Sequence, residues 1–551
     1  MAARQGGIGS RRGRSAEMRS DAIDSGAGST ESESPRIADL VEAAARRSPE
    51  ARALVVTAER IPVSYREVIV LVDDLAARLK AGGLLPGDRV ALRAGSNAEF
   101  VVGLLAASRA DLVAVPLDPA LPIAEQYARS EAVGARAVLV DQSGDADSDA
   151  TAPGGPPRWP IAVTLRSGGT APAVSLNLTA APRTDVSTPE GLRDDDAMIM
   201  FTGGTTGVPK MVPWTRHNMA SSVAAIIAGY GLGPRDATVA VMPLYHGHGL
   251  LAALLGTLAS GGAVLLPARG KFSAHTFWDD IGAVGATWYT AVPTIHQILL
   301  ERARTEHPGG TPSLRFIRSC SAPLTAETAQ ALHDTFSAPV VCAFGMTEST
   351  HQVATTAIGG AGGSEKPGAT PGLVGRSTGP EIRIVGSDGH TLPAETVGEV
   401  WLHGPTVVRG YLGDPSITAA NFTQGWLHTG DLGTLSPSGD LVIRGRIKEL
   451  INRGGEKISP ERVEGVLASH PDVLEVGVFG MPDKLYGETV AAVIVARGSA
   501  APTADELTAF CRDRLAPFEV PAEFQQAGEL PHTAKGSLDR RAVAQQFGRK
   551  A

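Results

Sequence analysis

The chain alternates between two patterns of hydrophobic and polar positions, which together predict an α/β fold. Residues 37–47 and 99–110 carry apolar side chains at helical spacing. Short apolar runs at 89–93, 112–116 and 197–200 predict buried strands. Strands that alternate with helices favour a mostly parallel sheet with helices on its faces.

This alternation changes farther along the chain. Clusters of Asp, Ser, Gly and Pro at 141–195 predict a surface excursion. Short apolar runs at 382–385, 398–402 and 441–444, separated by turn residues, predict a small β-rich unit. The last segment, about 449–551, has its own helical and strand patterns and is predicted to be a separate α+β domain.

Two segments raise questions of targeting. The run 249–267 is apolar enough to suggest a membrane span, but its Gly-Gly break and its place between polar motifs favour a buried helix followed by a strand. The first residues, 1–35, are rich in Gly, Ser, Arg and Glu and have no apolar core. This composition predicts a disordered tail rather than a signal peptide, and Met18 could be an alternative start.

Length and composition narrow the class of protein. At 551 residues the chain is too long for one core and should hold two or more domains. A net charge of −8 gives no basic surface for nucleic acid. The 3 cysteines are far apart, which favours neither a disulfide framework nor a metal cluster and predicts a reducing cytoplasm. The sequence leaves the oligomeric state open.

A glycine- and threonine-rich segment follows the predicted strand at 197–200. Its glycines let backbone N–H groups approach an anion, its hydroxyls add donors, and its lysine brings a point charge. We therefore predict a phosphate cradle, with a plain polar loop as the alternative. It is not a Walker loop, because Lys210 is followed by Met211. The residues concerned are Thr202, Gly203, Gly204, Thr205, Thr206, Gly207 and Lys210.

Two later segments add candidates for nucleotide binding. In the first, Phe344 could offer a face to a purine, Thr347 could donate to a phosphate, and Glu348 could hold Mg²⁺. The alternative here is an ordinary loop after an apolar strand. In the second, Asp431 could accept both hydrogen bonds of a ribose diol, and Arg446 could contact the same ribose or a phosphate.

Taken in order, these motifs resemble the signatures of the adenylate-forming superfamily. It includes acyl-CoA synthetases, firefly-type luciferases and the adenylation domains of peptide synthetases. The resemblance spans about residues 36–547. It implies a large AMP-binding domain at 36–447, built from two layered αβα lobes and a small β-barrel. A smaller, mobile α+β lid domain at 448–551 is expected to follow, with Lys448 at the hinge.

The resemblance also implies two half-reactions that use ATP, Mg²⁺ and coenzyme A. A carboxylic acid attacks the α-phosphate and forms acyl-AMP, and a thiol then displaces AMP. The glycine- and threonine-rich segment would hold the β- and γ-phosphates, Glu348 the metal, and Asp431 with Arg446 the ribose. Further expected contacts to nucleotide or coenzyme A are Ser321, Ala322, Pro323, Ala343, Phe344, Gly345, Met346, Thr347, Gly454 and Gly455. The expected catalytic residues are Lys210, His246, Thr347 and Lys535.

Within the superfamily the chain is most similar to oxalate–CoA ligases, over strings that include 242–250, 286–297 and 314–323. A long acyl chain needs an apolar tunnel, whereas these strings supply histidines, serines and an arginine, which suit a second carboxylate. We expect His246, at the family's acyl gate, and Ser321 to contact it.

Other interpretations stay open. His248 and His296 are more readily explained as core histidines that bond a carbonyl. A medium- or branched-chain fatty acid is the main alternative substrate. Because no carrier-protein attachment sequence follows the lid, free coenzyme A is expected rather than a tethered thiol.

The C-terminal signature departs from the family pattern. The family's lysine site holds Ser537, and Lys535 lies two residues earlier. Residues two apart in an extended chain face the same side about 7 Å apart, so Lys535 could substitute. Alternatively, adenylation is slow, since losing one electrostatic contact commonly costs about 10²–10³ in rate. A third interpretation is a protein that binds nucleotide and acid without useful turnover.

Overall fold

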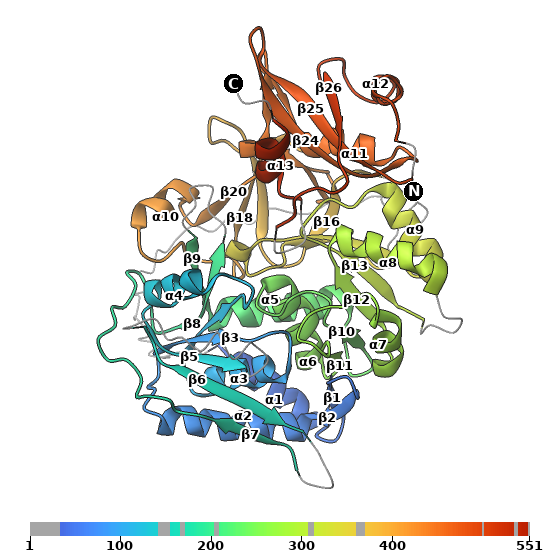
Figure 1. Cartoon of the computed structure of the whole chain (residues 1–551). Helices are drawn as coiled ribbons and strands as arrows, with labels where there is room; N and C mark the ends of the chain where they lie inside the picture. The colour runs from blue at the N-terminus through green and yellow to red at the C-terminus, as the bar shows by residue number, and fades with distance from the viewer. Residues whose placement is uncertain are drawn as a thin grey trace, which may run out of the picture. The chain divides into compact units, whose positions relative to one another are not determined.

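The structure is a computed structural model that describes residues 34–141, 155–165, 171–202, 209–306, 313–359, 370–498, 501–533 and 538–548. The chain from Pro35 to Ala551 forms one compact unit, and Met1–Ser34 forms another. The predicted tail lies almost wholly outside the described residues. Within these residues, helices alternate with strands along the chain, and the strands form four β-sheets (Figure 1).

The first sheet has seven strands and is mostly parallel, as the sequence predicts. The edge strands β7 and β9 run antiparallel to their neighbours. In spatial order the strands are β7 (Ala173–Leu176), β6 (Arg158–Thr164), β5 (Ala135–Asp141), β3 (Arg89–Arg93), β4 (Val113–Leu117), β8 (Asp196–Thr202) and β9 (Lys210–Thr215). The strands predicted at 89–93, 112–116 and 197–200 are confirmed.

The predicted surface excursion at 141–195 is wrong for part of its length, because β6 and β7 extend this sheet. Trp159 and Ile161 on β6 are wholly buried, and the Trp159 indole Nε1 donates to the Ala180 carbonyl at 2.9 Å. Both strands lie among turn-forming residues and β6 contains Pro160, so neither stood out from its surroundings as a strand.

The N-terminal half contains the helices α1 (Ile37–Arg47), α2 (Tyr65–Ala81), α3 (Ala98–Arg109), α4 (Ile123–Ala132) and α5 (Arg216–Tyr230). Of these, α2, α3 and α5 begin at capping side chains. Ser64, Asn97 and Thr215 each accept a hydrogen bond from a backbone amide of the first helical turn. The helices predicted at 37–47 and 99–110 are thereby confirmed.

The apolar run 249–267 folds as a buried helix and a strand, as predicted. It comprises a π-helix, η2 (His248–Leu255), the short helix α6 (Gly256–Ser260) and strand β11 (Ala263–Leu265). No helix in the described part of the chain is long and apolar enough to cross a membrane. The second sheet joins β10 (Ala237–Val239), β11, β1 (Arg52–Val56) and β2 (Ile61–Ser64) in that order.

The third sheet has ten strands and carries the candidate site. Its first three strands are parallel and the others antiparallel. The order is β12 (Trp288–Ala291), β13 (Phe316–Ser319), β14 (Val340–Phe344), β15 (Ala354–Thr355), β16 (Leu373–Ser377), β21 (Leu441–Arg446), β20 (Trp426–Leu435), β18 (Gly398–His403) and β17 (Glu381–Val385), with β19 (Phe422–Thr423) on β20. Strands predicted at 382–385, 398–402 and 441–444 are confirmed, and they share a sheet with β12–β14. The associated helices are α7 (Phe277–Val284), α8 (Pro293–Glu306), α9 (Ala326–Phe336) and α10 (Pro415–Asn421).

The C-terminal segment has a sheet and a core of its own. Its strands are β23 (Glu456–Ile458), β22 (Ile451–Arg453), β25 (Gly487–Ala496), β24 (Val473–Asp483) and β26 (Glu523–Gln526), and its helices are α11 (Pro460–Ala468), α12 (Ala504–Arg512) and α13 (Arg540–Phe547). The predicted α/β class, with a smaller α+β C-terminal part, is confirmed. The domain boundary at 447/448 stays a prediction.

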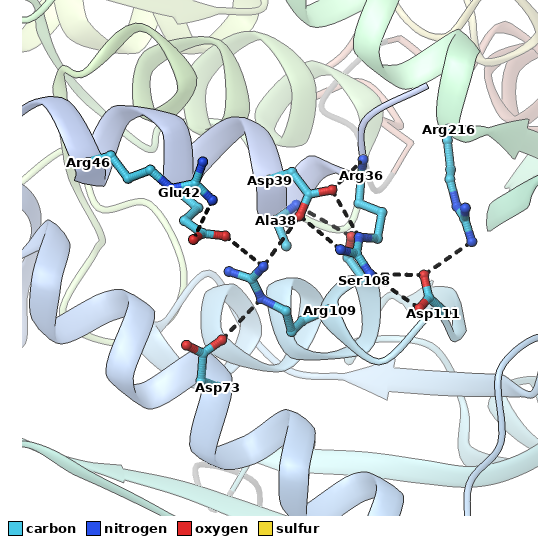
Figure 2. A network of polar contacts seen from close by, with 10 residues as sticks. All are labelled: Arg36, Ala38, Asp39, Glu42, Arg46, Asp73, Ser108, Arg109, Asp111 and Arg216. Atoms are coloured by element: carbon cyan, nitrogen blue, oxygen red, sulfur yellow. Dashed lines mark hydrogen bonds and ion pairs between the residues drawn. The ribbon is translucent and has the colours of Figure 1, made fainter. Parts of the chain in front are cut away.

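A network of ion pairs joins the helices α1, α2, α3 and α5, as Figure 2 shows. Asp111, directly after α3, pairs with Arg36 at 3.2 Å and with Arg216 at 3.1 Å. Arg109 pairs with Asp39 at 3.3 Å and with Asp73 at 3.0 Å. These side chains are partly exposed, so the network contributes little stability for each pair.

Candidate active site

The candidate site lies where the neighbouring parallel strands β13 and β14 end. Because such strands end at the same edge of a sheet, the segments that follow them meet there. One segment leads to Ser321 and the other to Phe344–Glu348. A third segment, residues 246–248, contacts both: His248 Nδ1 lies 3.2 Å from Ser321 Oγ, and the His248 ring stacks on His351 at 5.3 Å.

Arg318, on β13, is wholly buried at the centre of a polar cluster. Its Nε donates to Tyr230 Oη, on α5, at 2.7 Å. We use the name Arg318 cluster for Tyr230, His248, Thr290, Arg318, His351 and Gln352.

The other four N–H groups of this guanidinium also have acceptors. Arg318 Nη1 donates to Thr290 Oγ1 and to His248 Nε2, each at 3.0 Å. Nη2 donates to His351 Nε2 at 3.1 Å and to Gln352 Oε1 at 3.2 Å. All the donors of an arginine are therefore used, and every acceptor is an uncharged group.

The positive charge of Arg318 has no counter-ion in the described part of the chain, where no carboxylate forms an ion pair with it. Burial, the largest single effect, acts to lower the pKa of Arg318, but the effects of Tyr230 and Cys320 together outweigh it and raise the pKa above the ordinary value. The side chain therefore stays cationic. A buried cation held only by neutral groups favours an anionic ligand nearby.

The two imidazoles of the Arg318 cluster are neutral. Burial and, next, the charge of Arg318 hold the pKa values of His248 and His351 well below the usual value. The prediction that His248 bonds a carbonyl is wrong, since its partners are the side chains of Ser321, Thr290 and Arg318. A π-helix that starts at His248 was not visible in the sequence pattern.

The other candidate histidines lie outside this cluster. His296 is wholly buried, with Nδ1 3.2 Å from Tyr289 Oη, and burial lowers its pKa to about 3. His296 is thus a core histidine, as expected. His246 is half-buried two residues before His248, with its ring 4.9 Å from that of Tyr245.

The segment after β14 is held tightly by its own backbone. A Cβ on Gly345 would lie 1.5 Å from the His351 carbonyl oxygen, so only glycine fits there. The Thr347 carbonyl accepts from the Trp214 indole at 2.8 Å. Glu348 is buried, and its Oε1 accepts from Tyr411 Oη at 2.9 Å. Ala343 is buried, whereas Phe344 and Met346 are partly buried.

Thr202 and Lys210 face each other as paired residues of the antiparallel strands β8 and β9. The Lys210 ammonium lies 4.4 Å from the centre of the Tyr411 ring and 3.5 Å from Asn421 Oδ1. Burial lowers its pKa, while Glu348 acts to raise it. The residues Gly203, Gly204, Thr205, Thr206 and Gly207 lie outside the described residues.

Asp431 and Arg446 are brought together by the pairing of β20 with β21. Arg446 Nε lies 2.9 Å from Asp431 Oδ1. Asp431 is buried, and burial raises its pKa to about 6 against the opposing effect of Arg446. Before a ligand binds, the carboxylate thus already has one cationic partner.

The C-terminal candidates are spread over two places. Lys448 lies in a short 3₁₀ turn, and Gly454 and Gly455 form the turn between β22 and β23 with φ values of 58° and 97°. Lys535 and Ser537 lie outside the described residues. On either side of them, His532 and Leu538 pair in an antiparallel bridge, and His532 Nε2 lies 2.5 Å from Glu475 Oε1.

The segment that follows β13 contains Ser321, Ala322 and Pro323. Ser321 is exposed and has a strained left-handed backbone conformation at φ 73°.

Sequence reasoning missed His351 and Tyr411 as parts of the site. His351 lies three positions after Glu348, which was the available signal. Tyr411 had none, because it reaches Glu348 from a distant segment.

Comparisons with known proteins agree with this geometry. Two family descriptions match: AMP-binding enzyme over residues 41–412, and AMP-binding enzyme C-terminal domain over residues 462–537. The chain is 41% identical over 520 residues to an oxalate–CoA ligase of Arabidopsis thaliana, covering 94% of this chain and 99% of that protein.

Two further comparisons extend this result. A sulfoacetate–CoA ligase of Cupriavidus necator is 37% identical over 383 residues, covering 69% of this chain and 72% of that protein. The crystal structure of ATP-bound MatB from Rhodopseudomonas palustris superposes with a TM-score of 0.78 at 28% identity, covering 93% of this chain and 99% of that one.

Proposed function

Because the chain belongs to the AMP-binding enzyme family, we propose that it is an ATP-dependent acid–CoA ligase that acts on oxalate or another short dicarboxylate. The observation that carries the choice of acid is Arg318, a buried cation without a carboxylate partner among the described residues. Arg318 donates to His248, and His248 in turn contacts Ser321.

The Arg318 cluster favours a second carboxylate over an alkyl chain. A fatty acid would need apolar walls, whereas this edge of the sheet presents imidazoles and a hydroxyl in front of a fixed positive charge. The named substrates of the two relatives, oxalate and sulfoacetate, each carry a second anionic group, which supports this choice. We infer that His246 and Ser321 contact that group.

The residues on the nucleotide side suit ATP with Mg²⁺. Glu348 offers a buried carboxylate, and one or two carboxylates beside phosphates are the usual protein ligands of this metal. When bound, the metal would neutralise charge on the phosphates. Lys210 would hold the β- and γ-phosphates, Asp431 and Arg446 the ribose, and Phe344 the adenine.

The chemistry needs little from the chain beyond position and charge. In the first step a carboxylate oxygen of the acid bonds to the α-phosphorus, and pyrophosphate leaves with the electron pair of the broken P–O bond. In the second, the coenzyme A sulfur bonds to the acyl carbon, its proton passes to solvent, and AMP leaves. Gly454 and Gly455 would let the pantetheine arm lie against the backbone.

We infer that Lys535 replaces the lysine that the family has at the position of Ser537. Lys535→Ala should then lower oxalate-dependent turnover by about 10²–10³-fold, as loss of a transition-state contact does. Ser537→Lys in that background should restore it. Turnover that appears only when Ser537→Lys is introduced into the wild type would instead support the alternative of a protein that binds more than it catalyses.

The assay that tests the function is release of pyrophosphate and AMP with Mg·ATP and coenzyme A. Oxalate and malonate should support turnover, and fatty acids should not. Turnover with medium-chain acids alone would refute the proposal. A cytoplasmic location stays a prediction, supported by three free cysteines, Cys320, Cys342 and Cys511.

A further inference from the structure

Arg318 can only donate hydrogen bonds, and this property fixes the protonation of both histidines that it contacts. A guanidinium keeps all five N–H groups at physiological pH and has no acceptor. A nitrogen 3.0–3.1 Å from Nη1 or Nη2 must therefore present a lone pair. This condition applies to Nε2 of His248 and to Nε2 of His351.

Thr290 adds an independent constraint on His248. Its Oγ1 accepts from Arg318 Nη1 at 3.0 Å and lies 2.6 Å from His248 Nε2. The hydroxyl proton of Thr290 can therefore point to that nitrogen, which then accepts from two donors. A neutral imidazole whose Nε2 accepts carries its proton on Nδ1. His248 Nδ1–H consequently donates to Ser321 Oγ at 3.2 Å.

The same reasoning places the proton of His351 on Nδ1. No hydrogen-bond partner for this Nδ1 is present among the residues that the structure describes. The backbone of His351 is fixed by its contact with Gly345 and by the hydrogen bond from its amide to the Met346 carbonyl, at 3.0 Å. Its ring is stacked on His248 at an angle of 22°. The two imidazoles are thus held face to face.

We propose that Arg318 is a positioning residue that fixes His248 and His351 as neutral Nδ1–H tautomers. His351 then presents an N–H donor to the acid, and His248, which donates to Ser321 Oγ, leaves the Ser321 hydroxyl proton as the second donor. This inference rests on the proposed function of the site. All five N–H groups of Arg318 are used inside the cluster, so it has none left for a substrate and acts through the histidines.

Such an arrangement discriminates by hydrogen-bond type. A carboxylate offers only acceptors and matches two donors in front of a cation, here the His351 N–H and the Ser321 O–H. A group that must itself donate, such as an amide or an ammonium, would meet a donor and lose a hydrogen bond. Burial and, next, the charge of Arg318 keep both imidazoles neutral, so the N–H pattern does not change with pH near neutrality.

The first test reads the tautomers directly in the wild-type protein, without substrate. ¹⁵N-histidine labelling and long-range ¹H–¹⁵N NMR distinguish a protonated Nδ1 from a protonated Nε2, and His248→Gln and His351→Gln assign the signals. Both residues should show a protonated Nδ1 and an unprotonated Nε2 from about pH 6 to pH 8. A protonated Nε2 in either histidine would overturn the proposal, whatever acid the enzyme uses.

The second test removes the charge with Arg318→Met and follows kcat/KM for oxalate against pH. We expect a loss of about 10²-fold at pH 8, in KM for oxalate rather than for ATP, because two charge-assisted contacts are lost. Without the cation one of the two effects that hold the imidazole pKa values down is removed, so the loss should be smaller at pH 6 than at pH 8. The groups that face the imidazoles and could also titrate are Arg318, Tyr230, His246, His296 and Cys320.

Tyr230→Phe is the matched control, because it removes the partner of Arg318 Nε and leaves both imidazole contacts in place. Its pH profile should match that of the wild type. His246 is present in both proteins and therefore cannot cause a difference between them. An Arg318→Met loss that is equal at pH 6 and pH 8 would show a merely structural role and refute the proposal. If that variant does not fold, the NMR result on the wild type still decides.

Discussion

The nucleotide side and the acid side of the site hold positive charge in different ways. Arg446 is paired with Asp431 at 2.9 Å, and 61% of its side chain is exposed. Lys210 lies over the Tyr411 ring, partly buried. Arg318, in contrast, is wholly buried and has five neutral acceptors.

This difference matches the ligands. ATP with Mg²⁺ is large and brings its own compensating charge, so the residues that hold it can be shared with solvent and with other side chains. A two-carbon diacid offers few contacts and must find its electrostatic environment already built. The comparison therefore predicts that changes on the nucleotide side affect all acids equally, whereas changes on the acid side affect the short dicarboxylate.

The largest expected effect is on the nucleotide side. Glu348→Gln removes the carboxylate that would hold Mg²⁺ and should lower kcat by about 10²–10³-fold with every acid tested. Steady-state AMP release measures it. Tyr411→Phe, the matched control, removes only the hydrogen bond to Glu348 Oε1 and should cost less than about 10-fold. A Glu348→Gln defect confined to oxalate would contradict the assignment of Glu348 to the nucleotide side.

The next effect is on the acid side. His246→Ala should raise the KM for oxalate by about 10–100-fold, as expected for a hydrogen bond to a charged group, and leave the KM for ATP nearly unchanged. Initial rates with each substrate varied in turn measure the split. Equal changes in both KM values would show that His246 does not contact the acid.

A smaller effect concerns the buried carboxylate of the nucleotide side. Burial raises the pKa of Asp431 to about 6. Since this folded-state value lies above that of the unfolded chain, stability falls as pH rises through about 6, by at most about 3 kcal/mol. Asp431→Asn should therefore raise Tm at pH 7.5 and leave it unchanged at pH 4, while weakening ATP binding. A Tm difference that is independent of pH would contradict this account.

The smallest effect should lie far from both sides, in the ion-pair network of Figure 2. Asp111→Asn breaks its pairs with Arg36 and Arg216. Because these groups are partly exposed, unfolding by urea should show a loss of about 0–1 kcal/mol, with kcat unchanged for every acid. A loss several times larger would mean that the network organises the N-terminal helices.

The residues proposed for the nucleotide side could be singled out in the sequence because they follow one another in compact motifs. Phe344, Thr347 and Glu348 lie within five positions, and the pairing of β20 with β21 brings Asp431 to Arg446. The predicted helices and strands with clear periodicity were also confirmed. The strands β6 and β7 were missed because they lie among clusters of turn-forming residues.

The acid side was less predictable, since its chemistry depends on contacts between segments. The sequence indicated a polar environment but did not reveal that Arg318 joins His248 to His351, which are 103 positions apart in the chain. For the same reason His248 was assigned to the core. Burial of an arginine is visible only once strands β12–β14 have assembled around it.

The most direct test of the central claim is the ratio of kcat/KM for oxalate to that for oxamate, in which a neutral amide replaces one carboxylate, in AMP release with Mg·ATP and coenzyme A. The two acids have the same size and the same reacting carboxylate, and differ in the group that would face the Arg318 cluster. The account predicts a preference for oxalate of at least about 10²-fold, since the amide has one acceptor oxygen instead of two, no negative charge, and an NH₂ group that would face a donor. A ratio near one, or better turnover with octanoate than with either, would contradict it.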